Sequence, residues 1–315
     1  MTSTTVTSKP YLQRLWIYSK EMFPVLIYLP YVIALYLGMN FLTQAVSGQE
    51  IIIDTYGIVG MISAFFVMLQ MRTFDDLKDF DLDKDLFPWR ATARGDVKKS
   101  DIFSLMYISI GVLIIINLLF GQKTIVIFVI MMVYTIMTYK WFFAEQYHRD
   151  RPFFTMITHQ PIPWVINFYL IHTALASGGT YQAFTGEHWI LLLIFTLPVT
   201  AWEVSRKIRA VGNETHYETF SLLIGTRTAT IIPFIALLLS GALGIYIANL
   251  LGLSESFYGG MVILISYVCF IYGRFLVYPT KKNNILTNTA MIFTTLLFAN
   301  LLVHLLMNTG VEVNL

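Results

Sequence analysis

The chain has 315 residues, of which 56% are hydrophobic, 15% aromatic and only 13% charged, and its mean hydropathy is +0.65. A soluble domain carries about 25% charged residues, so this composition excludes a soluble enzyme, a disordered chain and a nucleic-acid-binding protein. The formal net charge of +2 is too small to indicate a polyanionic partner. A polytopic membrane protein is the class that remains.

Nine apolar runs are candidates for transmembrane helices, because a bilayer core needs about 20 apolar residues per helix. Helices are the expected spanning structure, since the runs are too long for barrel strands. The second, fourth and sixth runs are short, and each leads into a charged stretch into which its helix is expected to continue. In chain order the runs are Phe23–Val46, Thr55–Met71, Ile102–Gln122, Thr124–Tyr139, Pro152–Ala176, Trp189–Trp202, Thr228–Ser254, Ser256–Gly273 and Asn283–Val311.

Lysine and arginine residues gather in alternate connections, as the positive-inside rule requires of cytoplasmic loops. Twenty of the 21 lie on the side of the N-terminus, and Lys123 alone lies on the other side. We therefore expect an all-α fold with nine transmembrane helices and a cytoplasmic N-terminus. No secretory signal is visible, and the single cysteine, Cys269, excludes an internal disulfide.

The chain divides into a short N-terminal segment and one large domain. Residues 1–22 are expected to be a cytoplasmic or interfacial segment. It is either a short interfacial helix or a simple aromatic anchor, and the residues that could form one apolar face are Tyr11, Leu12, Leu15, Trp16 and Met22. Residues 23–315 are expected to form a single transmembrane domain. Two charged cytoplasmic loops, 72–101 and 203–227, occupy equivalent positions four helices apart, which indicates two related halves around a central cavity.

Aspartates are concentrated in the first of these loops. Asp75, Asp79 and Asp83 follow one another at intervals of four residues, and Asp76 is spaced to join them, so a continuing helix would present four carboxylates on one face. Four like charges on one face repel each other. A Mg²⁺ ion suits such oxygen ligands and keeps positions for water and phosphate oxygens. The alternative is a solvated acidic loop.

Basic side chains accompany the carboxylates. Arg72, Lys78 and Arg90 could hold phosphate oxygens, although each also obeys the positive-inside rule. In the second loop, Glu203 lies at the membrane boundary beside Arg206 and Lys207. An ionisable residue at that depth is a candidate functional residue, and its natural partners are a metal ion or these two cations.

The fifth run contains an unusual polar string. Thr158, His159 and Gln160 are followed by Pro161 and Pro163, which should kink the helix. Histidine and glutamine at membrane depth are costly unless they face a cavity. They are expected to line a substrate pocket, with His159 as a possible proton acceptor; an interhelical hydrogen bond is the alternative.

The aspartate segment resembles the first motif of the UbiA superfamily of intramembrane prenyltransferases. That motif is N-D-x-x-D-x-x-x-D followed by P-x-R-P. Here Asp75-Asp76-x-x-Asp79-x-x-x-Asp83 precedes Phe87-Pro88-Trp89-Arg90, with aspartate in place of the first asparagine and Ala91 in place of the last proline. The nine-helix plan and the positions of the two loops are also similar to that family.

The resemblance implies specific roles for these residues. It assigns Asp75, Asp76, Asp79 and Asp83 to Mg²⁺ that bridges a prenyl diphosphate. It also matches Arg90 to the Arg of P-x-R, and Lys140 to a family lysine that contacts diphosphate. Arg72 and Lys78 are expected to contact diphosphate because of their positions beside the aspartates. The acceptor pocket would be lined by Thr158, His159 and Gln160.

The second motif departs from the family pattern. The family has two aspartates spaced by four residues, whereas this chain has Glu203-x-x-Arg206-Lys207-x-Arg209. Arg206 and Lys207 could replace one Mg²⁺ as direct diphosphate ligands. Alternatively, a nearby glutamate still holds a metal ion; the candidates are Glu203, Glu214 and Glu218.

The resemblance implies a Mg²⁺-dependent prenyltransferase that acts on a prenyl diphosphate and a lipophilic, aromatic acceptor. A membrane terpene cyclase of the same superfamily is an alternative, and an ion-binding transporter is an alternative of another class. The transporter is disfavoured because the spans carry no acidic residue near the midplane. We expect a monomer in a lipid bilayer, that of a bacterial inner membrane, with no nucleic-acid partner.

Overall fold

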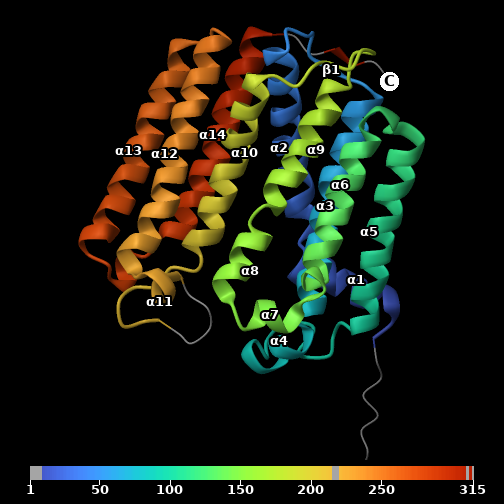
Figure 1. The fold of residues 1–315 in the computed structure, drawn as a ribbon, viewed down its shortest axis with the longest axis vertical. Coiled ribbons are helices and arrows are strands. Elements are labelled where there is room, and N and C mark those ends of the chain that lie inside the picture. Colours follow the sequence, from blue (N-terminus) through green and yellow to red (C-terminus); the bar gives the residue numbers. More distant parts are fainter. Residues whose placement is uncertain (1–8, 215–219, 310–311, 314–315) are drawn as a thin grey trace, which may run out of the picture.

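The computed structural model describes residues 9–214, 220–309 and 312–313. Within these ranges eight helical segments are long and apolar enough to cross a membrane. The chain is thus an all-α, multi-pass membrane protein (Figure 1). The helices of these segments are α2 (Val25–Val46), α3 (Thr55–Lys78), α5 (Lys99–Phe120), α6 (Ile125–Tyr139), α10 (Gly186–Ser205), α12 (Thr226–Leu250), α13 (Glu255–Val277) and α14 (Leu286–Asn308).

The remaining predicted span is divided into two helices. It consists of α8 (Pro152–His159) and α9 (Ile162–Leu175), which are interrupted at Gln160 and Pro161. The predicted kink is therefore a break, because proline lacks the N–H that would continue the helix. Tyr134 Oη donates to the Thr158 carbonyl at 2.8 Å, in the last turn of α8, where carbonyls lack helical donors. The count of nine spans stays a prediction.

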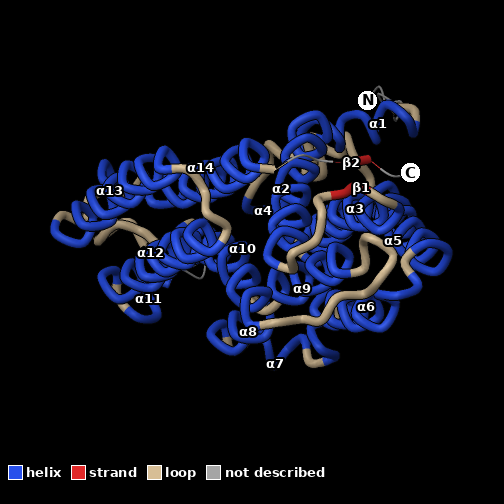
Figure 2. Tube along the Cα trace, turned by 90° about the horizontal axis from the view of Figure 1, so that it is seen from above, coloured by secondary structure: helices blue, strands red, loops and turns tan. Residues whose placement is uncertain are grey.

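The helices pack in two groups that share a central set. Figure 2 shows α12, α13 and α14 on one side and α3, α5 and α6 on the other. Helices α2 and α9 each contact both α3 and α10, so they join the two groups. Gly60 allows α3 to approach closely, since a Cβ atom there would lie 2.1 Å from Tyr36 Oη on α2 and 2.5 Å from Thr173 Oγ1 on α9.

Short helices gather at one end of the molecule, which we call the motif end (Figure 1). Helix α4 lies in the first charged loop and α11 in the second, so both loops lie at this end with the N-terminal helix α1. The cytoplasmic orientation of this end stays a prediction. The short helices at this end are α1 (Tyr11–Ile17), α4 (Phe80–Leu86), α7 (Glu145–Arg149) and α11 (Phe220–Ile224), with a π-helical turn at Tyr18–Met22 and 3₁₀ turns at Trp141–Phe143 and Lys281–Asn283. A further 3₁₀ turn, Gln122–Thr124, lies at the opposite end.

The opposite end carries two short strands that the sequence did not predict. Strand β1 (Ile52–Ile53) pairs in parallel with β2 (Glu312–Val313). Lys123 also lies at this end, where its Nζ donates to the Gly179 carbonyl at 2.5 Å. The isolated lysine predicted for the far side of the membrane thus satisfies a loop carbonyl.

Candidate functional site

The aspartate-rich segment lies where α3 reaches the motif end. Helical backbone bonds run through it, since Asp79 N donates to the Asp75 carbonyl at 3.0 Å and Asp83 N donates to the Asp79 carbonyl at 2.7 Å. Asp79 has φ −97° and ψ 5°, so α3 ends at Lys78 and α4 begins at Phe80. The expected continuous helix therefore bends at Asp79, and the four carboxylates fall into two kinds.

Asp76 and Asp83 are buried, and each is paired with an arginine. Arg72 Nη2 lies 2.8 Å from Asp76 Oδ1, and Arg72 Nε donates to Asp76 Oδ2 at 3.1 Å. Tyr18 Oη also donates to Asp76 Oδ2, at 2.8 Å. Arg90 pairs with Asp83. These two carboxylates hold in place two of the arginines predicted to bind diphosphate, and their role as metal ligands stays a prediction.

Asp75 and Asp79 are the second kind. Within the described ranges neither side chain has a hydrogen bond or an ion pair. The Asp75 side chain is exposed to solvent, although many protein atoms lie around it. Burial raises the pKa of Asp79, and the negative charge of Asp83 raises it further. A bound cation would therefore stabilise the ionised carboxylate of Asp79.

These carboxylates fit a Mg²⁺ ion that is shared with a ligand. In the part of the chain that the structure describes, no three His, Cys, Asp or Glu side chains converge on a metal-sized site. A diphosphate-bound Mg²⁺ needs no such cage, because it takes one or two carboxylates and fills its other positions with water and phosphate oxygens. Asp75 and Asp79, one helical turn apart, supply that donor set.

Lys78 connects the aspartates to an aromatic cluster. Its Nζ lies 4.8 Å from the centre of the Trp141 ring and 3.5 Å from His159 Nε2. His159 Nδ1 lies 2.9 Å from the Thr155 carbonyl oxygen, while Nε2 lies 3.3 Å from that of Thr138. The shorter contact favours the proton on Nδ1, which leaves Nε2 as an acceptor for the Lys78 ammonium.

A left-handed turn positions the Trp141 ring beside Lys78. Trp141, Phe142 and Phe143 have φ angles of 51°, 50° and 58°. The left-handed region costs a non-glycine residue roughly 1–2 kcal/mol, and such strain persists where the surroundings enforce it. The Trp141 ring lies 5.5 Å from the His159 ring, and Phe142 stacks on the buried His148 at 5.7 Å. The turn therefore builds an aromatic and imidazole cluster beside Lys78.

Lys140 immediately precedes this turn. Tyr139 stacks on Phe74 with ring centres 4.4 Å apart, which brings the end of α6 beside the first motif. Lys140 is exposed, and its Nζ lies 5.0 Å from the centre of the Tyr139 ring. The contact of Lys140 with diphosphate is thus sterically reasonable and stays a prediction.

The three residues expected in the acceptor pocket have different surroundings. Thr158 Oγ1 donates to carbonyls of its own helix, those of Phe154 at 3.1 Å and Thr155 at 3.0 Å. Gln160 is partly buried at the break between α8 and α9. His159 reaches the aspartate motif through Lys78. The string therefore borders the first motif, with His159 nearest to it.

The second charged loop presents a different arrangement. Glu203 on α10 accepts two hydrogen bonds from Arg206, with Nε–Oε2 2.5 Å and Nη2–Oε1 2.6 Å. Lys207 Nζ lies 3.9 Å from Glu203 Oε2 and 5.7 Å from the centre of the Phe220 ring. Glu203 is thus engaged by cations, and its metal role stays a prediction. Glu214 accepts from Gly212 N at 2.7 Å.

Glu218, the third candidate glutamate, belongs to residues 215–219, which lie outside the described residues. Helix α9 lies against both α3 and α10, the helices from which the two loops extend. The structure thus brings the first-motif aspartates, Lys78 and His159 into one neighbourhood and keeps Glu203 on a separate helix.

Sequence reasoning missed three residues of this neighbourhood. Tyr18 was not among the residues singled out in the N-terminal segment, yet it contacts Asp76. Trp141 follows Lys140 in an aromatic run and could have been inferred from that position. His148 could have been noticed because it lies 11 residues before His159, but the sequence does not show that their ring centres are 5.9 Å apart.

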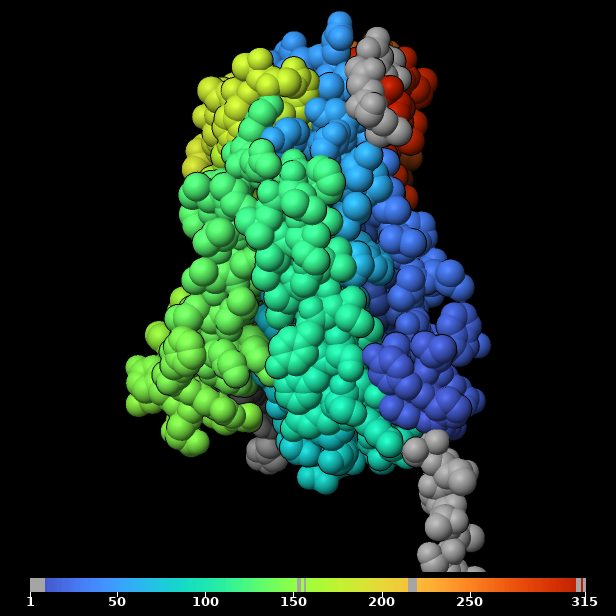
Figure 3. All heavy atoms as spheres, turned by 90° about the vertical axis from the view of Figure 1, so that its right-hand side faces the viewer, coloured from blue at the N-terminus to red at the C-terminus, as the bar shows by residue number. Residues whose placement is uncertain are grey.

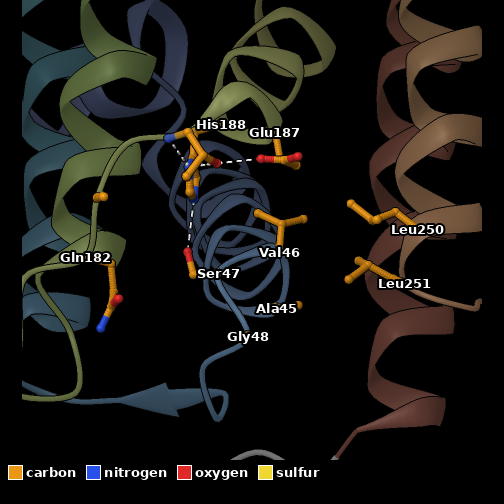
Figure 4. Close-up of a pocket in the computed structure, with 11 residues that line it drawn as sticks. Ala45, Val46, Ser47, Gly48, Gln182, Glu187, His188, Leu250 and Leu251 are labelled. Atoms are coloured by element: carbon orange, nitrogen blue, oxygen red, sulfur yellow. Dashed lines mark hydrogen bonds between the residues drawn. The ribbon is translucent and has the colours of Figure 1, made fainter.

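A hollow of about 470 Å³ lies at the opposite end, between the end of α2 and the start of α10 (Figure 4). In it Ser47 Oγ lies 2.9 Å from His188 Nε2, which resembles a serine–histidine pair. The Thr185 backbone N–H, however, donates to His188 Nδ1 at 2.9 Å, so the ring proton lies on Nε2. His188 cannot accept the Ser47 proton in this arrangement, and its contacts with Thr185 cap α10 rather than activate a nucleophile.

Comparison with known proteins identifies the fold. The sequence profile of the UbiA prenyltransferase family matches residues 31–302. The chain belongs to this family. The UbiA match begins in α2 and ends in α14, so it includes both charged loops. A search of curated protein sequences finds no match.

Two solved UbiA-like structures share the overall fold. A digeranylgeranylglyceryl phosphate synthase is 14% identical, with a TM-score of 0.63, and the alignment covers 93% of this chain and 99% of that one. An apo UbiA homologue from Aeropyrum pernix K1 is 11% identical, with a TM-score of 0.63, and the alignment covers 86% of this chain and 97% of that one. At these identities the likeness establishes the UbiA fold and leaves the substrates to be argued from the site.

Proposed function

We propose that this chain is a Mg²⁺-dependent prenyltransferase that moves a prenyl group from a prenyl diphosphate to a lipophilic aromatic acceptor. The observation that carries the proposal is the pair Asp75 and Asp79, whose carboxylates have no partner within the described ranges. They lie at the end of a candidate membrane span. Lys78 acts on the charge of both carboxylates, Arg72 on that of Asp75, and Arg149 and Arg90 on that of Asp79. This combination of unpaired anions and oriented cations suits a metal-bound diphosphate.

The diphosphate lies over the junction of α3 and α4 in this proposal. When bound, Mg²⁺ neutralises part of the diphosphate charge. Arg72 and Arg90 are each fixed by a buried carboxylate, so their remaining N–H groups keep constant directions for phosphate oxygens. Lys78 and Lys140 add mobile positive charge on the α6 side.

The second loop supplies the other half of the anion site. Arg206 is oriented by Glu203, and Lys207 is 38% exposed near the same carboxylate. Both side chains extend the positive charge from the α10 side. In this proposal they take the place of a second metal ion as ligands of the diphosphate.

The reaction begins when the allylic C1–O bond breaks and diphosphate leaves with the bonding electron pair. The allylic cation then bonds to a nucleophilic carbon or oxygen of the acceptor, whose proton passes to a base. Electrostatic stabilisation of the departing group is the main contribution expected of the cations. Ring faces add about 0.5–2 kcal/mol each for a cation, and Trp141 and Phe142 are the candidates nearest to Lys78 and His159.

His159 is the group that we propose receives the acceptor proton. Its Nδ1 contact with the Thr155 carbonyl leaves the Nε2 lone pair for a donor. The Lys78 ammonium occupies that position, with Nζ 3.5 Å from Nε2. It can turn from the imidazole to the diphosphate when the prenyl diphosphate binds. Thr158 and Gln160 line the same break in the helix pair and complete the acceptor side.

The proposed function is tested with purified protein in lipid nanodiscs, geranyl, farnesyl or geranylgeranyl diphosphate, and a panel of phenols and quinols. We expect pyrophosphate release that requires both Mg²⁺ and an acceptor, with a prenylated product seen by mass spectrometry. Release without acceptor, together with a cyclic hydrocarbon, would instead favour the terpene cyclase. Absence of release with every donor would contradict both enzymes, and ion flux in liposomes would then test the transporter.

A further inference from the structure

The N-terminal segment is attached to the first charged loop by ion pairs. Arg14 on α1 contacts Asp101 through both carboxylate oxygens, with Nε–Oδ2 2.7 Å and Nη2–Oδ1 2.8 Å, and Asp101 is only 1% exposed. Lys9 Nζ lies 2.6 Å from Asp96 Oδ1. Figure 3 shows the dark-blue segment lying against the lower part of the teal α5. A buried, bidentate pair holds its partners far more firmly than an exposed one.

The same two regions share an apolar core. Tyr18 and Met22 from the N-terminal segment, with the adjoining Phe23, are buried in one cluster with residues of α3, α4 and α5. Phe23 packs edge-on against Phe65 of α3, with ring centres 5.7 Å apart. A segment that only rested on the membrane surface would not bury its side chains among those of the first motif. The described part of the segment, residues 9–22, is therefore part of the folded domain.

A π-helical turn directs Tyr18 into this core. The turn spans Tyr18–Met22 and follows α1 directly, and Phe23 N closes it by donating to the Tyr18 carbonyl at 2.9 Å. Such turns are rare and occur frequently at functional sites. Tyr18 is 1% exposed, and its hydroxyl donates to Asp76 Oδ2, the oxygen that also accepts from Arg72 Nε.

We propose that Tyr18 is a positioning residue of the diphosphate site, which acts through Asp76 on the guanidinium of Arg72. The inference rests on the proposed function. With Tyr18 in place, Asp76 Oδ2 has two donors in fixed directions and Arg72 is held at both carboxylate oxygens. Arg72 is 33% exposed, so its free edge remains available to an anion. The N-terminal segment thereby forms part of the active site and is more than an interfacial anchor.

Tyr18→Phe is the direct test, because it removes the hydroxyl and keeps the buried ring. Tyr11→Phe is the matched control, since Tyr11 lies on α1 with an exposed ring. The probe is inorganic pyrophosphate with Mg²⁺, titrated calorimetrically into the purified full-length protein. Loss of one hydrogen bond to a charged group should weaken pyrophosphate binding about ten-fold in Tyr18→Phe, with no change in Tyr11→Phe.

A double-mutant cycle with Arg72→Gln separates positioning from a general loss of structure. If Tyr18 acts through Arg72, pyrophosphate binds Tyr18→Phe/Arg72→Gln no more weakly than it binds Arg72→Gln alone. Additive losses overturn the inference, as does wild-type affinity in Tyr18→Phe. Should Tyr18→Phe fail to fold, Tyr18→Met takes its place in the cycle with the same criterion, because it also removes the hydroxyl and keeps an apolar side chain. Wild-type protein that binds no pyrophosphate would overturn the proposed function itself, whereas wild-type binding without an effect at Tyr18 overturns the inference alone.

Discussion

The two charged loops at the motif end are built differently. The first loop, residues 72–101, buries Asp76 and Asp83 against arginines and has its own apolar core. In the second loop, residues 203–227, the ion pairs of Glu203 lie near the surface, where its side chain is 25% exposed and its partners are 47% and 38% exposed. The ion pairs of the first loop are therefore anchored on buried carboxylates, whereas those of Glu203 are solvent-exposed, although Ile208, Ala210 and Phe220 of the second loop are themselves buried.

This difference indicates where the geometry is fixed before a ligand arrives. Buried ion pairs are costly to rearrange, so Arg72 and Arg90 keep their positions. Exposed pairs exchange readily with water and salt. Precise contacts with the diphosphate and metal are thus expected from the first loop, while the second loop contributes adaptable positive charge. The predictions below test this division, from the largest expected effect to the smallest.

The largest effect is expected at Asp79. Asp79→Asn should reduce Mg²⁺-dependent pyrophosphate release at least about 100-fold, as for loss of a principal electrostatic contact in an active site. Asp81→Asn is the matched control in the same loop, because the Asp81 side chain is 77% exposed and pairs with Lys84 and Lys99. Equal activity of the two variants in a steady-state assay would contradict the assignment of Asp79 as a Mg²⁺ ligand.

The next effect concerns the thermal stability of variants in the two loops. Asp101→Asn removes the charge that Arg14 contacts through both carboxylate oxygens, and it should lower the thermal midpoint more than the loss of an exposed pair. Glu203→Gln disrupts an exposed pair and should cost about 1 kcal/mol or less. Thermal midpoints of the two variants in detergent give the comparison, and a larger loss in Glu203→Gln would contradict it.

A smaller effect is expected from the basic residues of the second loop. Lys207→Gln should raise KM for the prenyl diphosphate about ten-fold, since it removes one charged contact with phosphate. Its Mg²⁺ dependence should match that of the wild type, because no metal ligand is lost. A shifted Mg²⁺ requirement in this variant would instead indicate a metal ion held at the second loop.

The smallest effect is a pH dependence at Asp79. Its pKa is raised by burial and by Asp83, so the protonated form persists to a higher pH than for an ordinary aspartate. Mg²⁺ needs the ionised form, and its affinity should therefore be full above the raised pKa and decline as pH falls through it. In metal-free protein the sign is reversed, since the proton relieves repulsion, and stability should increase on acidification.

Asp79→Asn is the control for both pH effects. The variant has no ionisable group at this position, so its Mg²⁺ affinity should be weak at every pH and its metal-free stability should lack the increase on acidification. Calorimetric Mg²⁺ titrations and thermal melts between pH 5 and 8 supply the two curves. Parallel curves for variant and wild type would show that Asp79 does not titrate in this range.

Much of this arrangement could be predicted from the sequence. The apolar runs located the spanning helices, and Pro161 located the break between α8 and α9. The regular spacing of Asp75, Asp79 and Asp83 correctly indicated continuing helical hydrogen bonds. The bend at Asp79 could not be predicted, because a single residue with ψ near 0° leaves no compositional signal.

The partners of the carboxylates also could not be predicted. Asp76 and Asp79 are the same residue type within one helical turn, yet one is bound by Arg72 and Tyr18 and the other has no partner within the described ranges. Tyr18 lies 58 residues from Asp76 in the chain. Spacing along one helix does not show which side of that helix a distant segment will cover.

The sequence by itself determined the class of protein, the membrane segments and the positions of the charged loops, because hydrophobic length and charge placement are properties of local composition. Only the tertiary structure decided which aspartates pair with arginines and which have no partner within the described ranges. It also placed Tyr18 of the N-terminal segment against Asp76 of the first motif. Both decisions depend on packing between segments far apart in the chain, where burial and direct contact set the energy of each charge.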